Sequence, residues 1–212
     1  MYLDCHTHRI CNGSNSIVNL RDSNQEHHNF YYSYGFHPWE IEVSQGSWDK
    51  FELYLQDRKC LALGEIGLDK LKGPKIEVQT SRLYKQLEVN QTYNLPVIIH
   101  CVKSWNELNK IARTFKNFKW VFHGFNKVSI LDEILKEGWM ISVGASILNN
   151  EKLQNAIQTI PDEQLLLETD DKEMDIFEIY QKISKIKKIS LSELEGIITN
   201  NFKSTFKKWL IG

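Results

Sequence analysis

Residues 1–8 of the chain read Met-Tyr-Leu-Asp-Cys-His-Thr-His, a short apolar run that ends on two histidines one residue apart. In a β-strand, residues i and i+2 leave the backbone on the same face, so the imidazoles of His6 and His8 can bind one metal ion together. An isolated His-x-His is more often a pair of solvated or hydrogen-bonded histidines. The metal interpretation gains weight because four later runs of strand length end on residues that commonly bind metals.

The rest of the chain alternates between strand-like and helix-like patterns. Eight apolar runs have the length and composition of β-strands, at about residues 1–8, 17–20, 30–36, 60–65, 96–99, 120–122, 139–144 and 165–168. Apolar periodicity, capping residues and stop signals predict seven helices, at about residues 47–57, 76–93, 104–115, 128–137, 151–160, 176–187 and 191–210. From residue 47 to residue 187 the two patterns alternate without exception, and a second helix then closes the chain.

This alternation predicts parallel strands covered by helices. Two folds fit it, the (β/α)8 barrel and the doubly wound open sheet. In a barrel the C-terminal ends of all strands meet at one rim, so residues from distant strands can reach one centre. We therefore expect a distorted TIM-type barrel. The connections after its first two strands are too short for a crossover helix, which needs about a dozen residues in all. No repeat, low-complexity tract or linker divides the chain, so residues 1–212 are predicted to form a single domain.

Composition limits the classes of partner. With 26 Lys and Arg against 27 Asp and Glu, the net charge is −1, so an anionic substrate must be held by local groups. No apolar stretch is long enough to cross a membrane and no signal segment is evident, which predicts a cytoplasmic protein with no membrane or obligate protein partner. The four cysteines are far apart, which predicts reduced thiols. Cys5 and Cys101 adjoin candidate ligands and are expected to pack rather than coordinate.

Six residues at the expected strand ends form the candidate metal site: His6, His8, Glu65, His100, His123 and Asp170. Nitrogen and oxygen donors without thiolate suit Zn, Mn, Ni, Fe or Mg. Six donors exceed the ~four that one zinc ion binds, so either one ion has spare ligands or two ions share a bridge. Glu65 is the natural bridge because a carboxylate has two oxygens. Two ions about 3.5–4 Å apart could activate a water and hold an oxygen of a phosphoester.

The motifs of the chain resemble those of the TatD-related hydrolases, metal-dependent deoxyribonucleases of the amidohydrolase-like barrel group. They occur in the order of that family and span essentially the whole sequence: Asp4-Cys-His-Thr-His8, Gly35-Phe-His-Pro-Trp39, Gly64-Glu-Ile-Gly-Leu-Asp69, Pro96-Val-Ile-Ile-His-Cys101, His123-Gly-Phe125 and Glu168-Thr-Asp170. The resemblance implies one ion on His6, His8, Glu65 and Asp170 and a second on Glu65, His100 and His123. Asp170 would also act as the general base, so the implied catalytic residues are Asp170 and Glu65.

The chain departs from the family pattern at several positions. It is shorter between His8 and Gly35, where the spacing leaves no room for helices. Gly124 replaces the usual cysteine, Asn126-Lys127 stands where Ser-Gly is common, and Asp171-Lys172 replaces Ser-Pro. None of these positions is a proposed ligand, so the departures concern the entrance for the substrate.

Other residues are weaker candidates. His37 and Lys103 are expected to contact a substrate phosphate, although His37 could form only a turn with Pro38, and Lys103, like Lys127 and Arg9, could be a solvated surface charge. The leading function is hydrolysis of DNA phosphodiester bonds, of the exonuclease type, with two divalent ions of Zn, Mg, Mn or Ni. An amidohydrolase or small-molecule phosphoesterase is an alternative, because one barrel can serve either chemistry. A metal-binding protein with little turnover is the third reading.

Overall fold

A parallel sheet of eight strands forms the centre of the molecule. The computed structural model describes residues 1–10, 15–20 and 30–211, so most of the first two connections lies outside the described residues. Every strand pairs in parallel with the next in the chain. The strands are β1 (Asp4–Thr7), β2 (Ser16–Leu20), β3 (Tyr31–Tyr34), β4 (Cys60–Asp69), β5 (Val97–Val102), β6 (Trp120–Phe122), β7 (Met140–Val143) and β8 (Leu165–Leu167).

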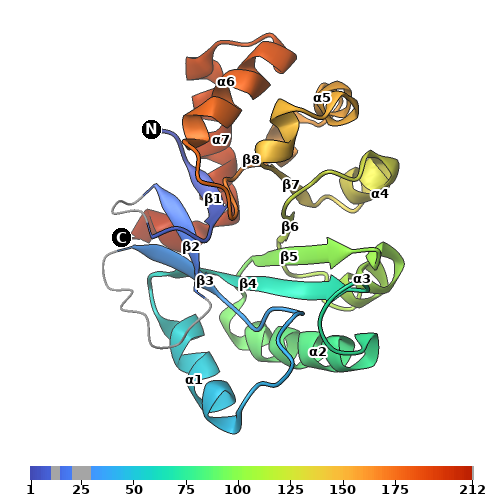
Figure 1. Cartoon of the computed structure of the whole chain (residues 1–212). Helices are drawn as coiled ribbons and strands as arrows, with labels where there is room; N and C mark the ends of the chain where they lie inside the picture. The colour runs from blue at the N-terminus through green and yellow to red at the C-terminus, as the bar shows by residue number, and fades with distance from the viewer. Residues whose placement is uncertain (11–14, 21–29, 212) are drawn as a thin grey trace.

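The first and last strands lie beside each other and bring the sheet round into a barrel (Figure 1). Just beyond β8, Asp170 forms a parallel bridge with Thr7 of β1. The Asp170 backbone N–H donates to the carbonyl of His6 at 3.0 Å, and the N–H of His8 donates to the Asp170 carbonyl at 3.0 Å. An open sheet would leave these edges apart, so the predicted barrel is confirmed.

Helices cover the outside of the barrel after the later strands (Figure 1). The described residues contain seven α-helices: α1 (Gln45–Gln56), α2 (Ile76–Tyr93), α3 (Trp105–Ala112), α4 (Leu131–Lys136), α5 (Glu151–Ile157), α6 (Ile176–Lys187) and α7 (Leu191–Thr205). No helix occurs among the described residues of the first two connections, 8–10, 15 and 30. None of the helices in the described part of the chain is long and apolar enough to cross a membrane.

Several helix boundaries differ from the sequence prediction, since α3 ends at Ala112, α4 starts at Leu131 after a 3-10 turn, and α5 ends at Ile157. The first helix begins at Gln45, two residues before the predicted start, because the side chain of Ser44 accepts the capping hydrogen bond from the backbone N–H of Ser47. The last helix ends at Thr205, and a 3-10 turn, η4 (Lys207–Ile211), follows it. The predicted start of that helix is correct, since the Ser190 hydroxyl accepts from the backbone N–H of Glu193 at 3.1 Å.

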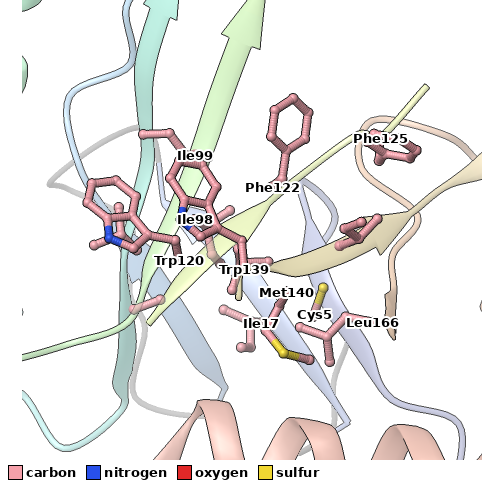
Figure 2. Close-up of a cluster of buried hydrophobic side chains, with 14 of the residues drawn as sticks. Cys5, Ile17, Ile98, Ile99, Trp120, Phe122, Phe125, Trp139, Met140 and Leu166 are labelled. Atoms are coloured by element: carbon pink, nitrogen blue, oxygen red, sulfur yellow. The ribbon is translucent and has the colours of Figure 1, made fainter. Parts of the chain in front are cut away.

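The strands contribute buried side chains to both faces of the sheet, as expected when helices cover a parallel sheet (Figure 2). Ile98 and Ile99 are neighbours in β5 and are both fully buried. The indoles of Trp120 in β6 and Trp139, just before β7, stack with ring centroids 5.1 Å apart. Three cysteines are buried free thiols, as predicted, and the fourth lies outside the described residues; the three are Cys5, Cys60 and Cys101.

Strand β4 is longer than predicted. The sequence analysis ended it at Glu65, but its pairing with β5 continues to Asp69, with Gly67 opposite His100. Glu65 and His100 therefore lie inside their strands and not at the ends. Backbone hydrogen bonds between β4 and β5 extend the strand to Asp69. The apolar pattern alone would not assign these further residues to a strand.

Gly67 lies close to the backbone of β5. A Cβ at this position would lie 2.0 Å from the carbonyl oxygen of His100, and the φ angle of 150° is one that other residues rarely adopt. We expect Gly67→Ala to lower the free energy of unfolding by roughly 4 kcal/mol or more, or to prevent folding, as measured by chemical denaturation. Gly196→Ala in α7 is the control, because no atom lies within 4 Å of its added Cβ. That variant should gain about 0.5–1 kcal/mol, and a Gly67→Ala variant of wild-type stability would contradict this account.

Candidate metal centre

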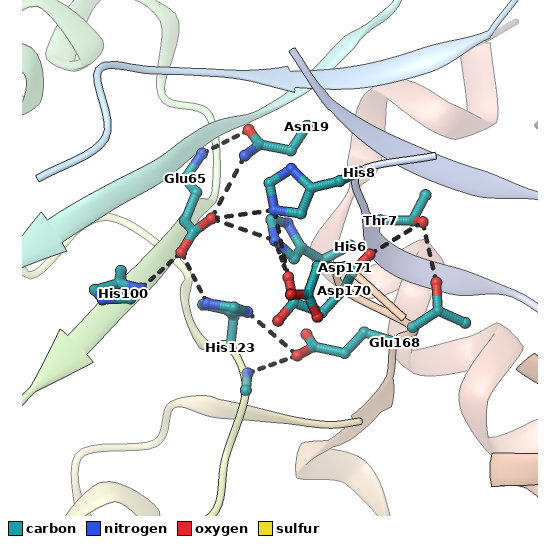
Figure 3. Close-up of polar contacts among 12 residues, drawn as sticks. His6, Thr7, His8, Asn19, Glu65, His100, His123, Glu168, Asp170 and Asp171 are labelled. Carbon is teal, nitrogen blue, oxygen red and sulfur yellow. Dashed lines mark hydrogen bonds and ion pairs between the residues drawn. The ribbon is translucent and has the colours of Figure 1, made fainter. Parts of the chain in front are cut away.

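The six side chains proposed as metal ligands converge at the C-terminal end of the barrel (Figure 3). Three of them lie within strands, His6 in β1, Glu65 in β4 and His100 in β5. The other three, His8, His123 and Asp170, lie within three residues after β1, β6 and β8. Residues from strands far apart in sequence thus share one centre, because the parallel barrel brings all these strand ends to the same rim.

Glu65 is at the middle of this centre, and its two carboxylate oxygens face different histidines (Figure 3). Oε2 lies 3.5 Å from Nε2 of His6 and 3.6 Å from Nε2 of His8. Oε1 lies 2.7 Å from Nδ1 of His100 and 2.9 Å from Nε2 of His123. The carboxylate therefore connects a pair of imidazoles on β1 with a pair on β5 and β6.

Asp170 completes the group on the β1 side. Its Oδ1 lies 3.3 Å from Nε2 of His8 and 3.6 Å from Nε2 of His6. The residue has a left-handed φ of 55°, a conformation that aspartate and asparagine tolerate better than most residues. This conformation occurs directly where the Asp170 backbone joins β1, so the closure of the barrel also places the carboxylate beside the two histidines.

Three groups of side chains have all their donor atoms within 4.8 Å of one another in the described residues: His6, His8 and Asp170; His6, Glu65 and His123; and His37, Glu65 and His100. His100 and His123 do not occur in the same group, although both contact the same oxygen of Glu65. The third group brings in His37, which the sequence analysis expected to contact only substrate.

The protonation of the site follows from its burial and its mixed charges. Burial alone would raise the pKa of Glu65, but the imidazoles of His123 and His100 hold that pKa well below its usual range. Burial and the nearby His123 ring lower the pKa of His6, yet the carboxylates of Asp170 and Glu65 outweigh them and raise it to about 9. The buried carboxylates therefore require positive charge around them, either on the imidazoles or on an ion.

The donor set fits a divalent cation. Both ring nitrogens of His6 are buried and have no hydrogen-bond partner among the described residues. Buried polar atoms are normally paired. The carboxylates of Glu65 and Asp170 come only within 3.5 and 3.6 Å of Nε2 of His6, which leaves this nitrogen available to an ion. Imidazole and carboxylate donors without thiolate suit Zn, Mn, Ni or Fe.

Comparison with known proteins agrees with this geometry. The profile of the TatD related DNase family matches residues 6–207.

The chain belongs to the TatD-related DNase family.

Its relatives in this family are distant. An uncharacterized metal-dependent hydrolase of Escherichia coli, YjjV, is 32% identical over 157 residues, which cover 68% of this chain and 59% of YjjV. The human deoxyribonuclease TATDN3 is 25% identical over 71% of this chain and 61% of its own length. The crystal structure of a TatD family hydrolase from Entamoeba histolytica superposes with a TM-score of 0.80 at 23% identity, covering 97% of both chains, and this shows the shared fold.

Two further carboxylates of this TatD-related chain hold candidate ligands in place. The sequence analysis quoted both in motifs but gave them no role. Oδ2 of Asp69 lies 3.2 Å from Nε2 of His100, and Oε1 of Glu168 lies 3.2 Å from Nδ1 of His123. Metal-binding histidines usually pass their other ring N–H to such a carboxylate, which fixes the ring and its tautomer. The signal for Asp69 was present in the sequence, since it lies at i+4 from Glu65 on the same face of one strand.

Asn19 is a further residue that the sequence analysis missed. Its side-chain oxygen accepts the backbone N–H of Glu65 at 2.9 Å, and its amide nitrogen lies 3.5 Å from Oε2 of Glu65. The signal was one polar residue within the apolar run of residues 17–20. Asn19, in β2, thus orients the carboxylate of Glu65.

The two residues proposed to contact substrate occupy different positions. His37 is buried, with Nε2 3.2 Å from Oε1 of Glu65, and its Nδ1 accepts the backbone N–H of Trp39 at 3.1 Å. Lys103 is exposed just after β5 and lines a hollow of about 270 Å³ together with Lys70 and Lys127. His37 therefore belongs to the centre itself, whereas Lys103 lies on the surface beside it.

Glu168 is expected to matter for metal affinity although it does not face the centre. It accepts from His123, from the backbone N–H of Gly124 at 2.6 Å and from the hydroxyl of Ser142. We expect Glu168→Gln to weaken metal binding about 10- to 100-fold, because the amide holds the His123 ring less firmly and in a less defined tautomer. Titration of the metal-free protein with Zn or Mn measures this. Glu163→Gln, on the exposed turn η3 (Asp162–Gln164), is the control, and equal affinities in both variants would contradict the role.

Proposed function

We propose that the chain is a metal-dependent phosphodiesterase that hydrolyses DNA, in the manner of an exonuclease, with two divalent ions held at the candidate metal centre. The observation that carries the proposal is the division of Glu65 between two sets of imidazoles. In this proposal one ion would be held by His6, His8, Asp170 and Glu65, and the other would be held by Glu65, His100 and His123. A carboxylate can bridge in this way because each of its oxygens has its own lone pairs.

Divalent ions at such a site lower the pKa of water and neutralise charge on a phosphoryl group. The side chains of the chain have separate tasks around this chemistry. Glu65 is 3% exposed, so solvent reaches it poorly and its role is to hold the ions. Asp170 is 33% exposed and accessible to an attacking water. Burial raises the pKa of Asp170, but contacts with His6 and His8 lower it well below its usual value, so the carboxylate is ionised.

The choice of DNA as substrate rests on the family and on local charge. TATDN3 is named a deoxyribonuclease, and the family profile carries the same activity in its name. Exposed or half-exposed lysines follow β4, β5 and β6 at the end of the barrel that holds the centre; they are Lys70, Lys72, Lys103 and Lys127. The net charge of −1 provides no wider basic surface, which keeps a small phosphoester as the second candidate substrate.

The test combines metal analysis with activity. Protein purified without chelator is analysed for metals by mass spectrometry and then incubated with oligonucleotides in the presence of Mg, Mn, Zn or Ni. We expect bound divalent ions and hydrolysis that chelator abolishes. The double variant His6→Ala/His8→Ala, purified in the same way, must lose the activity, which excludes a contaminating nuclease. Cleavage of p-nitrophenyl phosphate without cleavage of any nucleic acid would replace DNA with a small phosphoester.

A further inference from the structure

An exposed tryptophan lies at the edge of the candidate metal centre. Trp39 follows β3 and keeps 38% of its surface exposed, which is unusual for a large aromatic side chain. Its ring centroid lies 4.7 Å from that of His37 and 5.6 Å from that of His100. Both histidines contact Oε1 of Glu65, so the indole borders the place where a phosphate would bind.

The orientation of this indole is fixed. Its Nε1 donates to Oδ2 of Asp69 at 2.6 Å, and the same oxygen lies 3.2 Å from Nε2 of His100. The other oxygen of Asp69 accepts the backbone N–H groups of Leu71 and Lys72 at 2.7 and 3.1 Å. The carboxylate of Asp69 therefore holds Trp39, His100 and the loop after β4 in fixed positions. Little further ordering is needed when a ligand binds.

A cation accompanies the ring. Nζ of Lys72 lies 4.2 Å from the centroid of Trp39, and the lysine is exposed. An ammonium on a flexible stem can leave the ring for a stronger partner at modest cost. An aromatic face together with a mobile cation, next to a phosphate site, is the combination with which proteins bind single-stranded nucleic acid, because every base has a π-face.

We propose that Trp39 positions the substrate by stacking on the nucleobase next to the scissile phosphate, while Lys72 moves from the indole to the backbone of the same strand. This inference rests on the proposed phosphodiesterase function and names the group that recognises the nucleoside part. Stacking on the indole requires a nucleobase whose facing side is not covered by another base. An unpaired nucleotide offers such a base.

A purely structural role is the competing explanation, since Trp39 also holds Asp69 and, through it, His100. Two substitutions separate these roles. Trp39→Ala removes both the aromatic face and the N–H, whereas Trp39→Phe keeps a face for stacking and removes the N–H. If holding Asp69 were the only role, the two variants would be impaired equally on every substrate.

The experiment uses the metal-loaded protein and the dinucleotide TpT, which has a single phosphodiester bond, with two analogues in which an abasic sugar replaces the 5′ or the 3′ nucleoside. For TpT we expect Trp39→Ala to lower kcat/KM about 5- to 150-fold, the range for loss of one base stack. For one of the two analogues this loss should shrink to about twofold, because the stacked base is already absent. Trp39→Phe should keep most of the wild-type rate on TpT.

Equal losses for Trp39→Ala on all three substrates, or equal impairment of the Phe and Ala variants, would overturn the stacking role. If the wild-type protein cleaves none of the three, the proposed function fails instead, so the two failures are distinguishable. Lys72→Ala should raise KM for TpT and weaken its salt dependence. Lys85→Ala is the matched control, because Nζ of Lys85 lies 3.7 Å from the ring centroid of Trp48 on the helical layer. Equal shifts of KM in Lys85→Ala and Lys72→Ala would contradict the role of Lys72.

Discussion

Replacing Asp170 with asparagine is expected to lower the turnover of a DNA oligonucleotide about 10²- to 10⁴-fold, the usual effect of removing a general base. An amide cannot take the proton that the carboxylate would accept from water. Asparagine also tolerates the left-handed φ of 55° at this position, so the bridge to β1 should survive. Because Oδ1 of Asp170 faces His6 and His8, part of the loss will come from weaker metal binding on that side.

The measurement is single-turnover hydrolysis at saturating metal, with oligonucleotide binding measured separately. Binding should change far less than turnover, since the cations near the centre remain. Asp171→Asn is the matched control, because the same chemical change occurs one residue later on a side chain that is 61% exposed and paired with Lys172. A metal-loaded Asp170→Asn variant with nearly the wild-type rate would show that another group takes the proton.

Replacing Glu65 with glutamine is expected to remove metal from both parts of the centre. Its two oxygens face the His6 and His8 pair on one side and the His100 and His123 pair on the other. Glutamine has one neutral oxygen and an NH2 group that cannot bind a cation, so neither side keeps its shared ligand. Metal content should fall from about two ions per chain to well below one, and hydrolysis should fall with it.

His123→Ala is the comparison for this variant, because of the two oxygens of Glu65 His123 faces only Oε1, and it should therefore matter to a single ion. It should retain about one ion per chain. Thermal unfolding of both variants in the absence of metal controls for folding, since the bond between Asn19 and the backbone of Glu65 does not depend on the side-chain charge. Loss of one ion in both variants would defeat the bridging role of Glu65.

Local patterns in the sequence account for much of this fold. Apolar runs and helical periodicity placed the eight strands and seven α-helices found in the described residues, because both depend on spacings of two or about 3.6 residues along the chain. The boundaries were less accurate. Strand β4 runs to Asp69 because β5 lies beside it. The first helix starts at Gln45 because Ser44 caps it.

By itself, the sequence determined the kinds of donor at the candidate metal centre and the side of the barrel on which they lie. His6 and His8 share a face because the period of a strand is two, and parallel strands direct their C-terminal ends to one rim. The tertiary structure alone decided how these donors are shared. It placed His37 against Glu65, joined Asp69 to both His100 and Trp39, and used the backbone of Asp170 to close the barrel. These contacts join residues that are far apart in the chain, and their geometry depends on how the strands pack around the barrel, which no local spacing specifies.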